Sequence, residues 1–191
     1  MGRWLPNAQG RLIQAAMHLY SERGYEQTTV AEIAKQAGLT ERTFFRYFKD
    51  KREVLFFGSE MLERNLVEAL ERAPADLAPI DALGATLESA GSFFEPERLA
   101  HSRRRQAVID ANPELQERER KKLASIAVTL AAALQRRGVK GSTATLLAEM
   151  GIAVFKLAFE AWLSDPRERA YTYHLRASLN ELKALSAGSL S

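Results

Sequence analysis

Basic, polar and aromatic side chains gather on one short stretch near the N-terminus. From Thr40 to Lys51 the chain reads TERTFFRYFKDK. Phe44 and Phe48 are four residues apart, so they would share the inner face of a helix and leave the other side chains outside. Guanidinium groups bind guanine edges or phosphates, and threonine methyls and aromatic rings contact thymine methyls. The pattern therefore predicts a short helix that lies in the major groove of DNA.

Two further helices are needed to position these groups. Thr29 and Glu32 have the spacing of a capping box, which predicts the start of a helix. Gly38 suits a left-handed helix exit, and Thr40 is a good N-cap for the helix that follows. A helix over about residues 7–23 carries an apolar stripe that can back this pair. Together they predict a three-helix unit with a helix-turn-helix.

This region resembles the tetracycline-repressor (TetR) family of bacterial transcriptional regulators. The resemblance covers roughly the first 55 residues and is long and ordered. The matching residues are Ile13–Tyr20, Gly24-Tyr25, Thr28-Thr29-Val30, Ile33-Ala34, Ala37-Gly38-Leu39, Thr43–Phe48 and Lys51.

The resemblance implies phosphate contacts from Thr29, Tyr47 and Lys51. Elementary chemistry agrees, because a helix N-terminus offers free N–H groups, a phenol donates a hydrogen bond and an ammonium is a point charge. Arg46 is expected to face phosphate or solvent. Tyr47 could instead be a half-buried packing aromatic.

Base contacts are expected from the first residues of the second helix of the pair. Arg42 can bridge O6 and N7 of guanine, or hold a phosphate instead. Many family members carry Gly or Pro at this position and Tyr where Phe45 stands. The predicted DNA-binding set is Thr29, Thr40, Glu41, Arg42, Thr43, Phe45, Arg46, Tyr47 and Lys51.

Composition limits the classes of protein to consider. The chain has 191 residues, of which 46% are hydrophobic and 27% charged, and its net charge is +3. Cysteine is absent, which excludes disulfides and thiolate metal sites and fits a cytoplasmic location. The N-terminus lacks an apolar signal core. The most apolar run, residues 146–163, carries three charges, so no membrane span is expected.

Catalysis, metal binding and a cofactor find no support in the sequence. The histidines His18, His101 and His174 are scattered without metal-ligand spacing. No nucleophile elbow, phosphate-binding loop or dinucleotide fingerprint is present. We therefore expect a non-enzyme that holds neither metal nor cofactor.

The rest of the chain predicts a larger helical domain, so the fold class is all-α with about nine helices. Its boundaries are set at residues 1–50 for the helix-turn-helix domain and 51–191 for an effector-binding and dimerisation domain. A long helix over 51–72 would connect the two domains. Further helices are expected over about 79–94, 96–111, 113–137, 143–163 and 166–185. Residues 1–6 are expected to form a loose arm, although Arg3 and Trp4 could touch DNA.

The last two helices predict the homodimer contact. Residues 143–163 are apolar or small on most sides, and Tyr171, Leu175, Leu179 and Leu182 form a stripe on the final helix. Members of the resembled family dimerise through these helices. We expect a four-helix contact formed by about residues 143–185 of two copies.

The resemblance also implies a pocket for a small effector in the larger domain. The candidates are apolar or aromatic, which favours an apolar or aromatic ligand, although aromatics at helical spacing are ordinarily core. One polar contact to such a ligand could come from His101 or from the run Arg103-Arg104-Arg105. We otherwise interpret this arginine run as a solvated face rather than a second DNA patch. The predicted ligand-binding residues are Phe93, Phe94, His101, Met150, Phe155, Phe159 and Trp162.

The function predicted from the sequence is a TetR-like DNA-binding regulator, in the form of a repressor released from a palindromic operator by a small, largely apolar ligand. Two alternatives stay open. One is a helix-turn-helix regulator without an effector, whose second domain only dimerises. The other is a helical metabolite-binding protein that does not bind DNA.

Overall fold

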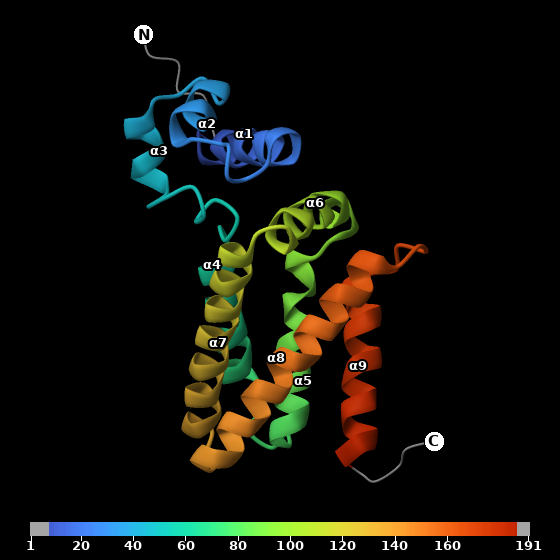
Figure 1. Cartoon of the computed structure of the whole chain (residues 1–191). Helices are drawn as coiled ribbons and strands as arrows, with labels where there is room; N and C mark the ends of the chain where they lie inside the picture. Colours follow the sequence, from blue (N-terminus) through green and yellow to red (C-terminus); the bar gives the residue numbers. More distant parts are fainter. Residues whose placement is uncertain (1–7, 187–191) are drawn as a thin grey trace. The chain divides into compact units, whose positions relative to one another are not determined.

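The computed structural model describes residues 8–186, and every regular element in that range is helical (Figure 1). The expected all-α class and nine α-helices are confirmed for this range. The predicted arm at residues 1–6 lies outside it. The elements are α1 (Ala8–Arg23), α2 (Val30–Gln36), α3 (Glu41–Tyr47), α4 (Ser59–Arg72), α5 (Pro79–Ser89), the 3-10 helices η1 (Ala90–Phe93) and η2 (Pro96–Arg98), α6 (Leu99–Asp110), α7 (Pro113–Arg136), α8 (Gly141–Ser164) and α9 (Tyr171–Ser186).

The chain divides into two compact units, and each unit combines two separate segments of the sequence. The first unit contains the described residues up to 57 together with residues 101–119, and the second contains residues 58–100 and 120 onward. The first unit therefore includes more than the three predicted helices, because most of α6 and the first turns of α7 pack with them.

The core of the first unit joins residues that are far apart in the sequence. Leu12 and Ala16 of α1, Ile33 of α2 and Phe44 of α3 are fully buried. The same cluster contains Val108, Ile109 and Leu115 from α6 and α7. Burial of this apolar surface holds the helix-turn-helix against α1, residues 54–56, α6 and α7.

The predicted helix over 51–72 begins eight residues later than expected, at Ser59. Residues 51–58 form consecutive turns instead, and Gly58 has a left-handed φ of +95°. Arg105 Nε donates a hydrogen bond to the Leu55 carbonyl at 2.6 Å, so a side chain from α6 takes an acceptor that a continuous helix would use. The tertiary contact thus replaces the local helical bond.

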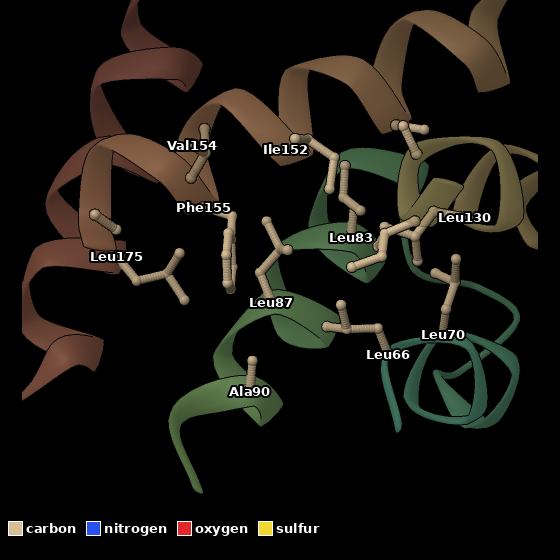
Figure 2. Close-up of a cluster of buried hydrophobic side chains, with 14 of the residues drawn as sticks. Leu66, Leu70, Leu83, Leu87, Ala90, Leu130, Ile152, Val154, Phe155 and Leu175 are labelled. Atoms are coloured by element: carbon tan, nitrogen blue, oxygen red, sulfur yellow. The ribbon is translucent and has the colours of Figure 1, made fainter. Parts of the chain in front are cut away.

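The second unit is built on α4, α5, α8, α9 and the later part of α7. Its buried cluster includes Leu66 of α4, Leu83 and Leu87 of α5, Leu130 of α7 and Phe155 of α8 (Figure 2). α8 and α9 pack extensively on each other. No described helix is both long and apolar enough to cross a membrane.

Two predicted helix boundaries in this unit were wrong. α5 ends at Ser89, and the chain continues as η1 rather than as α-helix to Phe94. α9 begins at Tyr171 rather than near Pro166, because Asp165 accepts backbone N–H bonds from Arg167 at 2.9 Å and Arg169 at 3.3 Å. These bonds form a compact turn, and such side-chain acceptors compete with helix formation.

Candidate nucleic-acid interface and ligand-binding residues

The capping box predicted at the start of α2 is present. Thr29 Oγ1 accepts a hydrogen bond from the Glu32 backbone N–H at 3.2 Å, and Glu32 Oε2 accepts one from the Thr29 N–H at 2.9 Å. The hydrogen bonds from the Thr29 backbone and hydroxyl lower the pKa of the Glu32 carboxyl. Thr29 is exposed, so its side of the helix N-terminus can face a phosphate.

The turn between α2 and α3 is a Schellman motif. The Leu39 N–H donates to the Ala34 carbonyl at 2.8 Å, and Gly38 adopts a φ of +64°. A Cβ at Gly38 would lie 2.7 Å from Nη2 of Arg11, whose guanidinium donates to the Ala37 carbonyl. The backbone angle favours glycine here, and a larger residue would also displace the Arg11 side chain.

α3 presents two different faces, as its sequence predicts. Thr40 caps the helix by accepting the Thr43 N–H at 3.2 Å. Phe44 and Phe48 are buried, and their ring centroids lie 5.5 Å apart. Phe45, the residue after Phe44, is 55% exposed, which is unusual for a large apolar side chain. The other exposed residues of this helix are Glu41, Arg42, Arg46 and Tyr47.

The outward side chains include donors suited to a duplex. Arg46 Nη2 lies 3.3 Å from the Tyr47 hydroxyl, and its guanidinium stands over the Tyr47 ring at 5.0 Å. Thr43 is half-buried, and its hydroxyl lies 3.0 Å from that of Thr40. Arg42 is exposed and lies in the first turn, where a recognition helix meets base edges.

Lys51 has a role that the sequence did not indicate. Its ammonium donates to the carbonyl oxygens of Tyr25 at 2.9 Å, Glu26 at 3.3 Å and Thr28 at 3.0 Å, and it lies 4.3 Å from the centre of the Tyr25 ring. An ammonium has three N–H donors, so these carbonyls engage them all. The geometry makes Lys51 a clamp on the α1–α2 loop, in contrast to the phosphate contact that the family resemblance implies.

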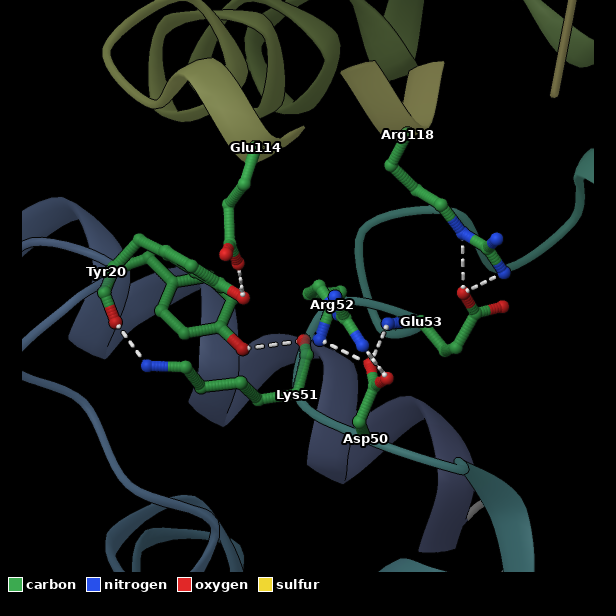
Figure 3. A network of polar contacts seen from close by, with 8 residues as sticks. Tyr20, Asp50, Lys51, Arg52, Glu53, Glu114 and Arg118 are labelled. Carbon is green, nitrogen blue, oxygen red and sulfur yellow. Dashed lines mark hydrogen bonds and ion pairs between the residues drawn. The ribbon is translucent and has the colours of Figure 1, made fainter. Parts of the chain in front are cut away.

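The segment that follows α3 is fixed by a polar network (Figure 3). Tyr20 donates its hydroxyl proton to the Lys51 carbonyl at 2.7 Å, and Tyr25 donates to Glu114 Oε1 at 2.8 Å. Burial, and for Tyr25 also the hydrogen bond to Glu114, raises the pKa of both phenols, so they remain protonated donors. Arg118 Nε donates to Glu53 at 2.9 Å. α7 therefore holds both the α1–α2 loop and the turns after α3.

The interpretation of Arg103-Arg104-Arg105 as a solvated face was wrong for Arg105. Its guanidinium bonds the Leu55 carbonyl, forms an ion pair with Glu119 at 3.2 Å and stands over the Phe56 ring at 5.3 Å. Burial lowers the pKa of this guanidinium, and Glu119 offsets that effect. Arg105 is thus a structural tie within the first unit, and of the three arginines Arg104 is exposed whereas Arg103 and Arg105 are half-buried.

Four of the predicted ligand-binding residues meet in one aromatic cluster of the second unit. The ring of Phe94 lies 5.6 Å from Phe155, 5.4 Å from Phe159 and 5.7 Å from Trp162, measured between centroids. Phe93 is half-buried on η1, and Met150 is half-buried on α8. His101 belongs to the other unit and is not part of this cluster.

Tyr171 completes the cluster, and the sequence did not single it out as a site residue. Its ring centroid lies 4.6 Å from that of Phe94 and 6.0 Å from that of Phe155. The residue is 1% exposed, and within the described range its hydroxyl has no hydrogen-bond partner. The sequence signal was only its place on the apolar stripe of α9, which indicates burial and says nothing about the hydroxyl.

A separate hollow lies on the surface between α5 and α9. It encloses about 230 Å³ and is bordered by two ion pairs, Asp81–Lys183 at 2.7 Å and Glu88–Arg176 at 3.0 Å. None of the predicted ligand-binding residues lines it. Its charged rim does not match the apolar ligand that the aromatic residues favour.

α8 exposes an apolar stripe on the face opposite its core contacts. Leu146 is 61% exposed and Leu157 is 56% exposed, with Ala153 and Ala161 exposed at intervening positions. On α9, Tyr173 is 52% exposed. Large apolar side chains repeated along one face mark a surface suited to a partner.

Among residues 8–186, no group of three or more histidine, aspartate or glutamate side chains is placed to hold a metal ion.

Known proteins resemble this chain over both of its parts. Residues 12–56 match the family described as bacterial regulatory proteins, tetR family. The transcriptional regulator TcmR of Streptomyces glaucescens is 34% identical over 87 residues, which are 46% of this chain and 38% of TcmR. That match therefore spans well under half of TcmR.

Two relatives match over most of their length. A Mycobacterium tuberculosis protein, MftR, named as a mycofactocin biosynthesis transcriptional regulator, is 28% identical over 171 residues, 86% of this chain and 84% of MftR. Thermus thermophilus FadR, a tetR-family repressor solved in complex with lauroyl-CoA, is 25% identical with a TM-score of 0.54, covering 96% of this chain and 95% of FadR.

Proposed function

We propose, from the premise that the chain belongs to the tetR family of bacterial regulatory proteins, that it represses transcription from a palindromic operator and is released by a small, largely apolar ligand. The observation that carries the proposal is the outer face of α3. Arg42, Phe45, Arg46 and Tyr47 are exposed together on a helix whose inner face is buried.

DNA binding requires both positioning and base contacts. Phosphate contacts set affinity and register, whereas base-edge contacts set sequence preference. We assign base contacts to Glu41, Arg42, Thr43 and Phe45, because they occupy the first turns of α3. We assign phosphate contacts to Thr29, Thr40, Arg46 and Tyr47.

A homodimer would double this surface. Recognition helices must lie about 34–36 Å apart to enter successive major grooves on one side of the duplex. We assign the contact to α8 and α9, where Leu146, Leu157 and Tyr173 are exposed. A second copy that packs its own α8 and α9 on these residues would bury them in a four-helix contact.

The ligand would act through differential affinity. A ligand that binds more tightly to a conformation in which the two recognition helices have a different spacing lowers operator affinity. The size of this effect is set by the difference in the ligand's affinity for the two conformations. The FadR relative was solved with lauroyl-CoA, whose acyl chain is apolar. This supports an apolar effector for the second unit, where the aromatic cluster lies.

The proposal is tested by selecting bound duplexes from a random pool and then measuring binding in solution. We expect the selected sequences to be palindromic and the protein to be dimeric by sedimentation. Leu157→Glu should convert the dimer to monomers and weaken operator binding, whereas Lys156→Glu, an exposed neighbour, should do neither. No salt-sensitive duplex binding, or a monomer that binds as tightly as the dimer, would refute the proposal.

A further inference from the structure

The aromatic cluster, defined as Phe94, Phe155, Phe159, Trp162 and Tyr171, has one member that differs from the rest. Phe155, Phe159 and Trp162 stand on α8, and Tyr171 begins α9. Phe94 instead follows η1 and is not part of any helix. Its ring lies within 4.6–5.7 Å of the other four centroids, so it occupies the centre of the group.

The backbone that carries Phe94 lies between two short 3-10 helices. η1 and η2 span four and three residues, and Phe94 connects them through Glu95. Short 3-10 helices have fewer and poorer hydrogen bonds than α-helices. The Phe94 N–H makes one such bond, to the Gly91 carbonyl at 3.0 Å. This segment can therefore move at a lower cost than the α8 and α9 walls.

The cluster is sealed unevenly. Phe155, Trp162 and Tyr171 are between 0% and 7% exposed, whereas Phe94 and Phe159 are half-buried. The half-buried rings of Phe94 and Phe159 therefore lie between solvent and the deep side of the cluster.

The deep side carries a polar group that the apolar rings cannot satisfy. Within residues 8–186 the Tyr171 hydroxyl has no hydrogen-bond partner, although the residue is 1% exposed. Burial also raises the pKa of this phenol, so it stays a neutral donor. Buried polar groups are nearly always paired, and an unpaired one calls for an explanation.

We propose that Phe94 is a resident plug in a ligand site walled by Phe155, Phe159, Trp162 and Tyr171. The ligand is a flat aromatic ring that carries one hydroxyl or other group able to pair with the Tyr171 hydroxyl. It takes the place of the Phe94 ring and supplies the missing hydrogen bond. This inference rests on the proposed function, because it identifies the effector class of the same domain.

The first test uses toluene, which matches the phenylalanine side chain, and the three cresols, which add a hydroxyl. Binding is measured by calorimetry to the full-length wild type, Phe94→Ala and Phe57→Ala, an exposed phenylalanine of the first unit that serves as the matched control. We expect Phe94→Ala to bind toluene about tenfold more tightly than the wild type, because the plug is gone. Phe57→Ala should match the wild type. Equal affinities in all three proteins, or no binding by any, would overturn the site.

The second test isolates the hydroxyl. In the Phe94→Ala background, one cresol isomer should be preferred over toluene, and Tyr171→Phe should reduce that preference about five- to tenfold. Tyr171→Phe should also raise the thermal stability of the ligand-free protein, because it removes a buried unpaired group. A preference that is unchanged by Tyr171→Phe would overturn the role of Tyr171.

The third test asks whether the plug moves in the native protein. With 4-fluorophenylalanine at position 94, saturating cresol should shift the fluorine resonance of an otherwise wild-type chain. An unchanged resonance, with cresol binding only after Phe94→Ala, would show that Phe94 is a permanent core residue and would overturn displacement.

Operator binding, measured in parallel, separates this inference from the proposed function. Cresol binding that leaves duplex affinity unchanged would reject ligand-controlled regulation and retain the site. A duplex affinity that responds to some other ligand, equally in Phe94→Ala, Tyr171→Phe and wild type, would reject the site and retain the regulation.

Discussion

The Lys51 ammonium donates a hydrogen bond to the Thr28 carbonyl at 3.0 Å, one residue before the N-cap of α2. Lys51 follows α3, so this contact ties the end of the helix-turn-helix to its beginning. The Tyr20 hydroxyl bonds the Lys51 carbonyl in turn. The residue therefore fixes the entry of α2 and the exit of α3 at once.

Lys51→Met should lower stability without changing the count of phosphate contacts. It retains the aliphatic stem and removes the charge-assisted bonds to Tyr25, Glu26 and Thr28, which predicts a loss of about 1–2 kcal/mol in the free energy of unfolding. A residue that contacts phosphate would lower the slope of log affinity against log salt by about one when removed. Chemical denaturation and operator titrations at several salt concentrations measure both quantities. An intact stability with a smaller slope would restore the phosphate role.

Arg42→Ala should relax the sequence preference for DNA and leave the fold unchanged. Arg42 is exposed on α3, and loss of a bidentate guanine contact would cost about 1–3 kcal/mol at one base position. Arg46→Ala is the matched comparison, because it should weaken all duplexes alike. Random-pool selection followed by titration distinguishes the two patterns. A uniform loss for Arg42→Ala would identify it as a phosphate contact.

Gly38→Ala should destabilise the first unit more than Gly24→Ala. Both glycines have left-handed φ angles, +64° and +85°, which cost alanine about 1–2 kcal/mol. Only Gly38 also places the new Cβ 2.7 Å from Arg11, whereas nothing lies within 4 Å at Gly24. The difference between the two free energies of unfolding reports the α1 contact. Equal losses would show that Arg11 moves aside freely.

Asp165→Asn should reduce the dependence of stability on acid pH. The hydrogen bond from Arg169 is the main cause of the lowered pKa of this carboxyl. Burial acts in the opposite direction, and hydrogen bonds from the backbone N–H groups of Arg167 and Arg169 lower the pKa further. A group whose folded pKa is depressed contributes stability that is present above its unfolded pKa, about 3.9, and is lost as pH falls through the folded value.

Acid titrations of unfolding therefore test Asp165. The wild type should lose stability as pH falls below about 4, and Asp165→Asn should show a shallower loss with lower stability at neutral pH. Glu181→Gln, an exposed change on α9, should retain the wild-type profile. A variant profile parallel to that of the wild type would exclude Asp165 as the source.

The sequence by itself determined the local structure of the helix-turn-helix. The capping box of Thr29 and Glu32, the glycine turn and the four-residue spacing of Phe44 and Phe48 depend on neighbours along the chain, and the structure contains all of them. The same local patterns gave the all-α class, the order of the helices and the aromatic residues of the second unit.

Only the tertiary structure decided what supports these elements. Tyr25 and Glu114 are 89 positions apart, and Arg105 and Leu55 are 50 apart, so no local pattern links them. The turns over 51–58, the clamp formed by Lys51 and the Tyr171 hydroxyl, which has no partner among residues 8–186, all follow from such distant packing. Helical spacing shows which side of a helix is buried. The residues that this side contacts depend on how separate helices pack together.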